Sequence, residues 1–426
     1  MFLSARRLSS SFSTTTALRP SGILRALLVL ALLIPAATEA QAPEPGAAPP
    51  GAGSPSSAPV ASGTDGSELD VEILFNYYEQ DGENSPVTGG IGTEEMDVIS
   101  PVILLRWKQS DRWTYQAQLG IDNISSASTD NIDLGEAEVS SASRMDNRAY
   151  TTLTATRTME QQDVGVTFGF SKEYDYSSFM GGLSWSRNFR QQNTTLSAGL
   201  RHYSDTIDLY GIDGIQRGQD DRSTTDFNFG WTEVLGPKTL GSLELSVSSQ
   251  DGFLSTPFHE VILAPTPQFP DGQRVAERLP DSRLRTALAL RLSHAVSKRF
   301  VPRFYYRLYD DDWGVQSHTA ELELWFRLPT EREQWLYPIL RYYTQDAADY
   351  FGLPRTFDAG TEFFTADRDL SEFTSDKYGV GWRWNLGGAS GRGRLRYFET
   401  RLTTYSRDDG LDSTSLSFGI GLRFNP

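Results

Sequence analysis

The stretch from Thr414 to Phe424 constrains the fold more than any other part of the chain. Its apolar residues occupy every second position, and small or polar residues stand between them. Strict alternation is typical of a β-strand with two different faces. The apolar face could lie in the core of a soluble protein, or it could face lipid in a membrane barrel whose lumen takes the polar face. The alternating apolar residues are Leu416, Phe418, Ile420, Leu422 and Phe424.

The same alternation recurs along the body of the chain. We count sixteen such segments, and most are long enough for a tilted membrane-crossing strand of about 9–11 residues. Fourteen or eighteen strands remain alternatives, and the segment over 393–405 is ambiguous in phase. The segments lie near 69–78, 96–109, 113–122, 148–158, 162–174, 179–190, 193–204, 225–235, 239–250, 284–292, 303–308, 319–326, 336–343, 379–385, 393–405 and 414–424.

The connections between segments alternate in length. Those after even-numbered segments are short, whereas those after odd-numbered segments are mostly longer and acidic. An outer-membrane barrel has short periplasmic turns and long extracellular loops, and it must close because lipid tolerates no open sheet edge. We therefore predict an all-β fold, a single closed antiparallel transmembrane β-barrel over 68–426 in the Gram-negative outer membrane. The long connections are 80–95, 123–147, 205–224, 251–281 and 346–372.

The residues before this body have a different composition. Four arginines precede the apolar run 26–34, and small residues at 38–40 offer a cleavage site, which predicts a cleaved secretory signal peptide over 1–40. An uncleaved anchor is the rival interpretation. Residues 41–67 are nearly all Ala, Pro, Gly and Ser, which predicts a disordered linker.

Composition excludes several classes of function. The chain has no cysteine, which excludes disulfides, thiolate catalysis and c-type haem attachment within it. Its net charge of −16 argues against nucleic-acid binding, which needs a basic surface. We expect no cofactor and no nucleic-acid partner. The body holds no run of 18 apolar residues, so we expect no transmembrane helix there.

Five phrases of the body, taken together, resemble the uncharacterised outer-membrane barrel family called domain of unknown function 3570. The resemblance covers most of about 69–426, in order, and leaves out 1–68. It implies a Gram-negative outer-membrane barrel, and it supplies no activity and no catalytic residues. The phrases are MDVISPVILLR (96–106), IDNISSAS (121–128), DGFLSTPF (251–258), YRLYDDDWGVQSH (306–318) and LRYYTQDAADYF (340–351).

Charged residues on the lumen-facing side of neighbouring segments are the main candidates for a functional site. Neighbouring strands bring opposite charges together as cross-strand pairs. The set is either a charged constriction that selects solutes by charge or a salt-bridge ladder that stabilises the wall, and both interpretations stay open. This lumen charge ladder comprises Arg285, Arg291, Arg303, Arg307, Glu321, Glu323 and Arg341.

Carboxylates gather in three loops, at 310–312, 346–349 and 408–409. Hard cations take several oxygen ligands, so a surface Ca²⁺ site is one interpretation. The spacing matches neither an EF-hand nor a calcium-binding nonapeptide repeat. We therefore interpret these carboxylates as solvated loop residues and predict no metal site.

The four histidines do not form a metal or catalytic motif in the sequence. They are His202, His259, His294 and His318, with no HExxH pattern among them. Ser317 precedes His318 directly, so on a strand the two side chains face opposite ways, against a Ser–His catalytic pair. We predict that the protein is not an enzyme and has no catalytic residues; a rim-sited surface hydrolase is the third function hypothesis.

Two other functions lead. The first is a channel or transporter for small solutes with a charged lumen, and the alternative is a non-enzymatic scaffold or sheath for periplasmic or surface partner proteins. Outer-membrane lipid, the barrel assembly machinery during biogenesis and a periplasmic partner are the expected partners. The alternating residues of 414–424 resemble an assembly signal, although Asn425 and Pro426 follow the last aromatic residue. We expect this strand to pair with Leu69–Tyr78.

Overall fold

The computed structural model describes residues 67–126, 145–211, 215–386 and 395–424. The predicted signal peptide (1–40) and nearly all of the predicted linker (41–67) lie outside these residues, as does most of the connection 123–147. Within the described residues no helix has the length and apolarity needed to cross a membrane.

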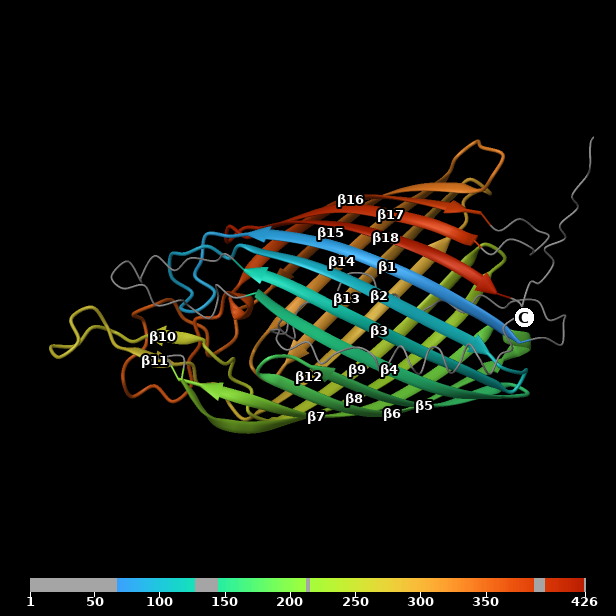
Figure 1. The fold of residues 1–426 in the computed structure, drawn as a ribbon. Helices are drawn as coiled ribbons and strands as arrows, with labels where there is room; N and C mark the ends of the chain where they lie inside the picture. The colour runs from blue at the N-terminus through green and yellow to red at the C-terminus, as the bar shows by residue number, and fades with distance from the viewer. Residues whose placement is uncertain (1–66, 127–144, 212–214, 387–394, 425–426) are drawn as a thin grey trace, which may run out of the picture. The chain divides into compact units, whose positions relative to one another are not determined.

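Sixteen antiparallel strands form a closed barrel, which confirms the predicted fold class and strand number (Figure 1). Each strand pairs with its neighbours in sequence, except that β9 pairs with β12 and β1 pairs with β18. Strands β10 and β11 make a separate two-stranded sheet within the connection between β9 and β12. The strands are β1 (Glu68–Asp81), β2 (Met96–Lys108), β3 (Trp113–Ser126), β4 (Met145–Met159), β5 (Gln162–Lys172), β6 (Tyr176–Phe189), β7 (Thr194–Tyr210), β8 (Gln216–Gly236), β9 (Thr239–Gly252), β10 (Glu260–Ile262), β11 (Arg274–Ala276), β12 (Ser282–His294), β13 (Phe300–Asp311), β14 (Gln316–Arg327), β15 (Gln334–Gln345), β16 (Phe373–Asn385), β17 (Leu395–Arg407) and β18 (Asp412–Phe424).

The two faces of the wall carry different side chains. Large apolar side chains point outward and are open to the surroundings, with Phe168 66%, Leu183 59% and Leu340 43% exposed. An outer apolar surface of this extent marks a membrane or protein contact rather than a soluble monomer. The polar and charged side chains of the same strands point inward. We call the end of the barrel with the short connections the turn end and the other the loop end.

The seam of the barrel lies between the first and last strands, as predicted. Leu69 faces Phe424 and Tyr77 faces Leu416 across it, and blue β1 runs beside red β18 in Figure 1. On the inner face Arg423 donates to both oxygens of Asp70, at 2.6 and 3.0 Å. The outward residues Leu416, Phe418, Ile420, Leu422 and Phe424 all belong to this seam.

One predicted loop is wrong. Most of 205–224 continues the ladder of β7 and β8, which pair from Thr194 opposite Glu233 up to Tyr210 opposite Gln216. The stretch is mostly polar, and its few apolar residues, such as Ile207 and Leu209, do not sustain an alternation over the length of the strands. Alternation reports two different environments, so strands that extend beyond the alternating region keep their ladder hydrogen bonds and lose the pattern.

Inward-facing tyrosines lie over glycines on the next strand. Gly381 is the register partner of Tyr337, and a Cβ placed on Gly381 would lie 2.1 Å from that ring. Gly421 stands in the same way opposite Tyr397. Glycine at these positions lets a large ring lie flat on the curved wall.

Candidate functional site

The seven residues of the predicted lumen charge ladder all lie on the inner face of β12–β15, and one pair among them forms an ion pair. Nη1 of Arg303 lies 3.8 Å from Oε2 of Glu323. Glu321 and Arg341 are register partners without an ion pair between them. Arg285 stands in register with Asp311. The remaining two, Arg291 and Arg307, stack on tyrosine rings of β13.

Toward the turn end, two carboxylates are held in a network of rings. Oε2 of Glu323 accepts a hydrogen bond from Nε1 of Trp325 at 2.7 Å. The indole of Trp325 stacks on the ring of Tyr337 at 3.9 Å between centroids, and Tyr337 is fully buried. The hydroxyl of Tyr337 donates to Glu399, two strands away. This network, Glu323–Trp325–Tyr337–Glu399, is the carboxylate belt.

Three arginines neutralise the carboxylate belt. Arg303 lies over the indole of Trp325 at 4.0 Å, in addition to its contact with Glu323. Arg401 approaches Glu323 at 3.8 Å, and Arg383 binds Glu399 at 2.8 Å. Packed rings and matched charges indicate a structural role for this part of the ladder, because removing one partner would leave the others inadequately compensated.

Nearer the loop end, cations outnumber anions on the inner face, although the Glu321 carboxylate lies in the same row. No described carboxylate lies within ion-pairing distance of Arg291, Arg307, Arg341 or Lys377, which we call the cationic row. Arg291 and Arg307 lie over the rings of Tyr305 and Tyr309 at 4.6 and 5.2 Å. Arg341 and Lys377 are register partners, so two cations stand side by side.

The charge of this part of the wall is therefore positive. On the inner face of β12–β17 cationic side chains outnumber anionic ones, although the whole chain is acidic. The cations are Arg283, Arg285, Arg291, Arg303, Arg307, Arg327, Arg341, Lys377, Arg383, Arg401 and Arg407, and the anions are Asp311, Glu321, Glu323 and Glu399.

The opposite part of the wall is small and neutral. The inner face of β3–β6 is dominated by hydroxyl, amide and glycine residues that bond to one another, as Thr154 and Thr167 do at 3.0 Å. Its charged residues stand near the strand ends. The neutral residues include Thr114, Gln116, Gln118, Thr152, Thr154, Thr156, Thr167, Ser171, Ser178 and Ser184.

Three connections pack together at the loop end and form a small folded unit, the cap. They are residues 82–95, residues 253–281 with β10 and β11, and residues 346–372 with the short helix η3 (Arg368–Leu370). Figure 1 shows β10 and β11 beyond the ends of the barrel strands. The apolar centre of the cap consists of Val261, Leu263, Phe364 and Ala366, with Val275 and Phe357 against it.

Hydrogen bonds lock the cap segments to one another and to the wall. Arg368 donates two bonds to the carbonyl of Gly89 at 3.0 and 2.8 Å. Arg407 of β17 binds Asp369 at 2.5 Å, and the Gln345 amide of β15 donates to the Asp369 carbonyl at 2.9 Å. Residues 346–372 are thus anchored in part to β15 and β17, which lie on the cationic side of the lumen.

Two loop-end carboxyl groups have raised pKa values. Burial raises the pKa of Glu94 in the cap from its ordinary 4.5 to about 7, against the opposing effect of Arg407. Burial also raises the pKa of Asp175, between β5 and β6, to about 6. Desolvation disfavours the charged carboxylate in both cases.

The loop carboxylates predicted as solvated residues take part in local structure. Asp311 is buried and accepts two hydrogen bonds from the guanidinium of Arg283, at 3.0 and 2.6 Å. Asp312 accepts from the Leu284 amide at 2.9 Å, and Asp408 from the Thr374 amide at 2.9 Å. These groups hold hairpin ends to neighbouring strands.

The serine and the histidine of the surface-hydrolase hypothesis lie on opposite faces of β14. His318 shares the outer face with Leu308, its register partner, and Nδ1 lies 2.8 Å from the Tyr306 hydroxyl. Ser317 is buried on the inner face. His202 is also on the outer face, beside Thr225, and His294 bonds Thr239 at the turn end.

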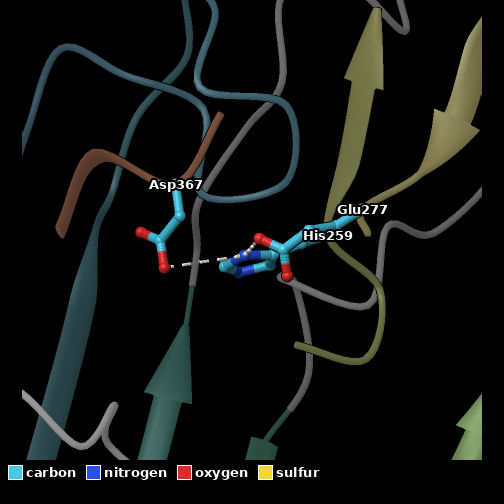
Figure 2. A group of neighbouring side chains, drawn as sticks. All are labelled: His259, Glu277 and Asp367. Atoms are coloured by element: carbon cyan, nitrogen blue, oxygen red, sulfur yellow. Dashed lines mark ion pairs between the residues drawn. The ribbon is translucent and has the colours of Figure 1, made fainter. Parts of the chain in front are cut away.

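The fourth histidine belongs to a group that the sequence did not reveal. His259, Glu277 and Asp367 come from three places in the cap and meet in its interior (Figure 2). Burial raises the pKa of Glu277 to about 7. No short motif joins the three residues, so only the folded cap brings them together.

The chain matches, over residues 46–417, the family described as protein of unknown function (DUF3570), and it belongs to that family. The family resemblance of the sequence is thereby confirmed. The match begins upstream of the expected start at about 69 and ends within β18. No curated protein matches the chain.

Among solved structures the chain is similar to outer-membrane barrels. A bacterial polysaccharide outer membrane secretin has a TM-score of 0.46 and 10% identity, covering 84% of this chain and 98% of that chain. OccK7 (OpdD) of Pseudomonas aeruginosa has a TM-score of 0.37 and 11% identity, covering 84% and 99%. The CymD monoaromatic hydrocarbon channel has a TM-score of 0.38 and 10% identity, covering 85% and 89%. Similarity at this level carries no solute or mechanism over to this chain.

Proposed function

We propose that the protein is a channel of the Gram-negative outer membrane that passes small anionic solutes. The observation that carries this proposal is the cationic row of Arg291, Arg307, Arg341 and Lys377 on the inner face of the barrel. Charged side chains lining a pore select the solutes that pass by their charge.

The outer surface supports the membrane part of the proposal. Apolar side chains alternate outward around a closed wall, as a lipid-facing barrel requires. Short connections lie at the end where β1 begins and β18 ends, and most of the long ones lie at the other. This arrangement supports a periplasmic turn end and an extracellular loop end.

The neutral wall supports the transport part. Hydroxyl and glycine residues on β3–β6 occupy little of the lumen, while long arginine side chains reach in from β12–β17. A solute moving along the neutral wall would face the cationic row. Small anions would gain Coulomb attraction at that point, whereas cations would be repelled.

Reversal potentials in planar lipid bilayers under a KCl gradient test this function. The wild-type barrel is expected to favour Cl⁻ over K⁺. Replacing Arg291, Arg307 and Arg341 together by Gln should lower the permeability ratio by roughly two-fold or more, because three positive charges that form no ion pair with a described carboxylate leave the lumen.

The matched control is Thr154→Val on the neutral wall, which changes a lumen side chain of similar size without changing charge. It should leave the permeability ratio unaltered. A folded barrel that prefers K⁺, or that keeps its selectivity in the triple variant, would contradict the proposal. A sealed barrel without current would favour the scaffold alternative.

A further inference from the structure

We propose that His259, Glu277 and Asp367 form a binding site for one divalent transition-metal cation, which ties two segments of the cap together. One candidate ligand atom from each residue lies within 4.8 Å of the others. Figure 2 shows the imidazole directed toward the two carboxylates. The proposal concerns the cap and goes beyond channel activity.

The β10–β11 hairpin positions two of the three side chains. His259 directly precedes β10 and Glu277 directly follows β11. The Glu277 amide donates to the His259 carbonyl at 3.0 Å, so this pair extends the antiparallel ladder by one step. Opposed residues of an antiparallel pair place their side chains on the same face. The fold of the hairpin therefore brings an imidazole and a carboxylate together.

Asp367 reaches the same place from the segment before η3. Its Oδ1 atom accepts the Asp369 amide at 2.9 Å and so caps η3. Its Oδ2 atom lies 3.9 Å from Nδ1 of His259. One oxygen thus fixes the side chain, and the other faces the histidine.

The distances fit ligands around a shared ion better than direct hydrogen bonds. Nδ1 of His259 lies 4.0 Å from Oε1 of Glu277, which is beyond hydrogen-bonding distance, as is its separation from Asp367. The Nδ1 atom is buried and has no hydrogen-bond partner in the described part of the chain. A tetrahedral ion with bonds of about 2.0–2.1 Å separates its ligand atoms by roughly 3.3 Å. Binding would shorten the two separations from the His259 nitrogen by roughly 0.6–0.7 Å, and that between the two carboxylates, now within 4.8 Å, by at most about 1.5 Å.

Hydrogen bonds from outside the group orient the Glu277 carboxylate. Oε1 accepts from the Thr365 hydroxyl at 2.6 Å, and Oε2 accepts from the Thr256 amide at 2.7 Å. Thr365 is completely buried. Outer partners of this kind fix the ligands of protein metal sites and strengthen binding. Here they come from two different segments of the cap.

The burial and the donor types indicate the class of ion. The side chains of Glu277 and Asp367 are 1% and 8% exposed, so two carboxylates share a buried space with one imidazole. A divalent cation would offset the negative charge that burial makes costly. An imidazole nitrogen with carboxylate oxygens suits Zn²⁺ or Mn²⁺ better than Ca²⁺, which takes 6–8 oxygen ligands. Three protein ligands leave at least one position for water.

Calorimetric titration of the full chain, purified in detergent and stripped with a chelator, tests the site with Zn²⁺ as the probe. We expect one ion per chain. His259→Ala should weaken binding at least ten-fold, and Asp367→Asn should also weaken it while keeping an oxygen for the η3 cap. Thr365→Val should weaken it by about ten-fold, since it removes a bond that orients Glu277.

His294→Ala is the matched control, because His294 lies at the turn end beside Thr239 and outside the cap; its binding should equal that of the wild type. Heat-modifiable migration on a gel shows that each variant has kept its barrel. Equal Zn²⁺ affinity in wild type and His259→Ala, or no binding by the wild type, would overturn the proposal. In a second measurement, Zn²⁺ should slow trypsin cleavage after Arg278 of the cap in the wild type and not in Asp367→Asn.

Discussion

The two sides of the lumen are stabilised by different kinds of interaction. The inner face of β3–β6 uses small side chains that bond to a direct neighbour, as Thr154 bonds Thr167. The inner face of β13–β17 uses rings and charges that reach past the adjacent strand, as Tyr337 reaches Glu399. One side of this barrel therefore supplies most of the bulk and charge of the lumen. Interactions on that side are interdependent, whereas those on the neutral side are local.

The seam is where the charged side meets β1, and its loss should have the largest effect. Deleting residues 416–424 removes the strand that pairs with both β1 and β17 and leaves two open edges. Because open edges cannot persist in lipid, we expect no assembled barrel. Heat-modifiable gel migration checks this. Removing only Asn425 and Pro426 should leave assembly intact, and failure of that shorter deletion would place the signal at the last two residues.

The second prediction compares a glycine that lies against a packed ring with a glycine that has open space beside it. Gly381→Ala should destabilise the barrel by about 1–3 kcal/mol, because its Cβ would overlap the Tyr337 ring, on which the carboxylate belt depends. Gly181→Ala should be within about 0.5 kcal/mol of wild type, since a Cβ there meets nothing within 4 Å. Unfolding in urea measures both. Equal effects of the two substitutions would show that Tyr337 moves freely.

The third and smallest effect concerns pH at the cap. Glu94 has a pKa raised from 4.5 to about 7 by burial, so the folded cap favours the protonated carboxyl. This stabilisation is complete below about pH 4.5 and is lost as the pH rises through about 7. Hydrogen exchange of residues 82–95, corrected for its intrinsic pH dependence, should therefore be faster at pH 8 than at pH 5. Glu94→Gln should remove this difference between the two pH values. The control Glu83→Gln, at an exposed position of the same loop, should retain the difference. A pH effect that persists in Glu94→Gln would show that another group causes it.

Alternation in the sequence was sufficient to predict the barrel, its sixteen strands and the seam, because each strand has lipid on one face and the lumen on the other. It failed for the loop-end part of β7 and β8, where the ladder continues through a mostly polar stretch. It was also ambiguous in phase at 393–405, and the structure gives the reason: a register shift between Leu395 and Tyr397. That ambiguity concealed Glu399 and Arg401, which complete the carboxylate belt around the predicted pair Arg303 and Glu323.

The cap could not be predicted, since its partners share neither a period nor a motif. Phe364 packs with Val261, and Thr365 bonds Glu277, across 88 residues in the latter case. The order of the strands in the closed barrel decides which loops become neighbours, and these contacts form between those loops. The inner-face position of the ladder residues could be predicted from parity, whereas the division into paired and unpaired charges could not. Whether a ladder residue forms an ion pair depends on how far its side chain extends toward an opposite charge.

The cap also has a consequence for the order of events during biogenesis. Its segments come from the first, middle and late parts of the chain: Gly89 bonds Arg368, and Glu260 bonds Val87. These segments are brought together by the strands that carry them. Contacts over such sequence separations are slow to form because loop closure must precede them. We therefore expect the cap to be one of the last parts to fold, after the strands that carry its segments have paired.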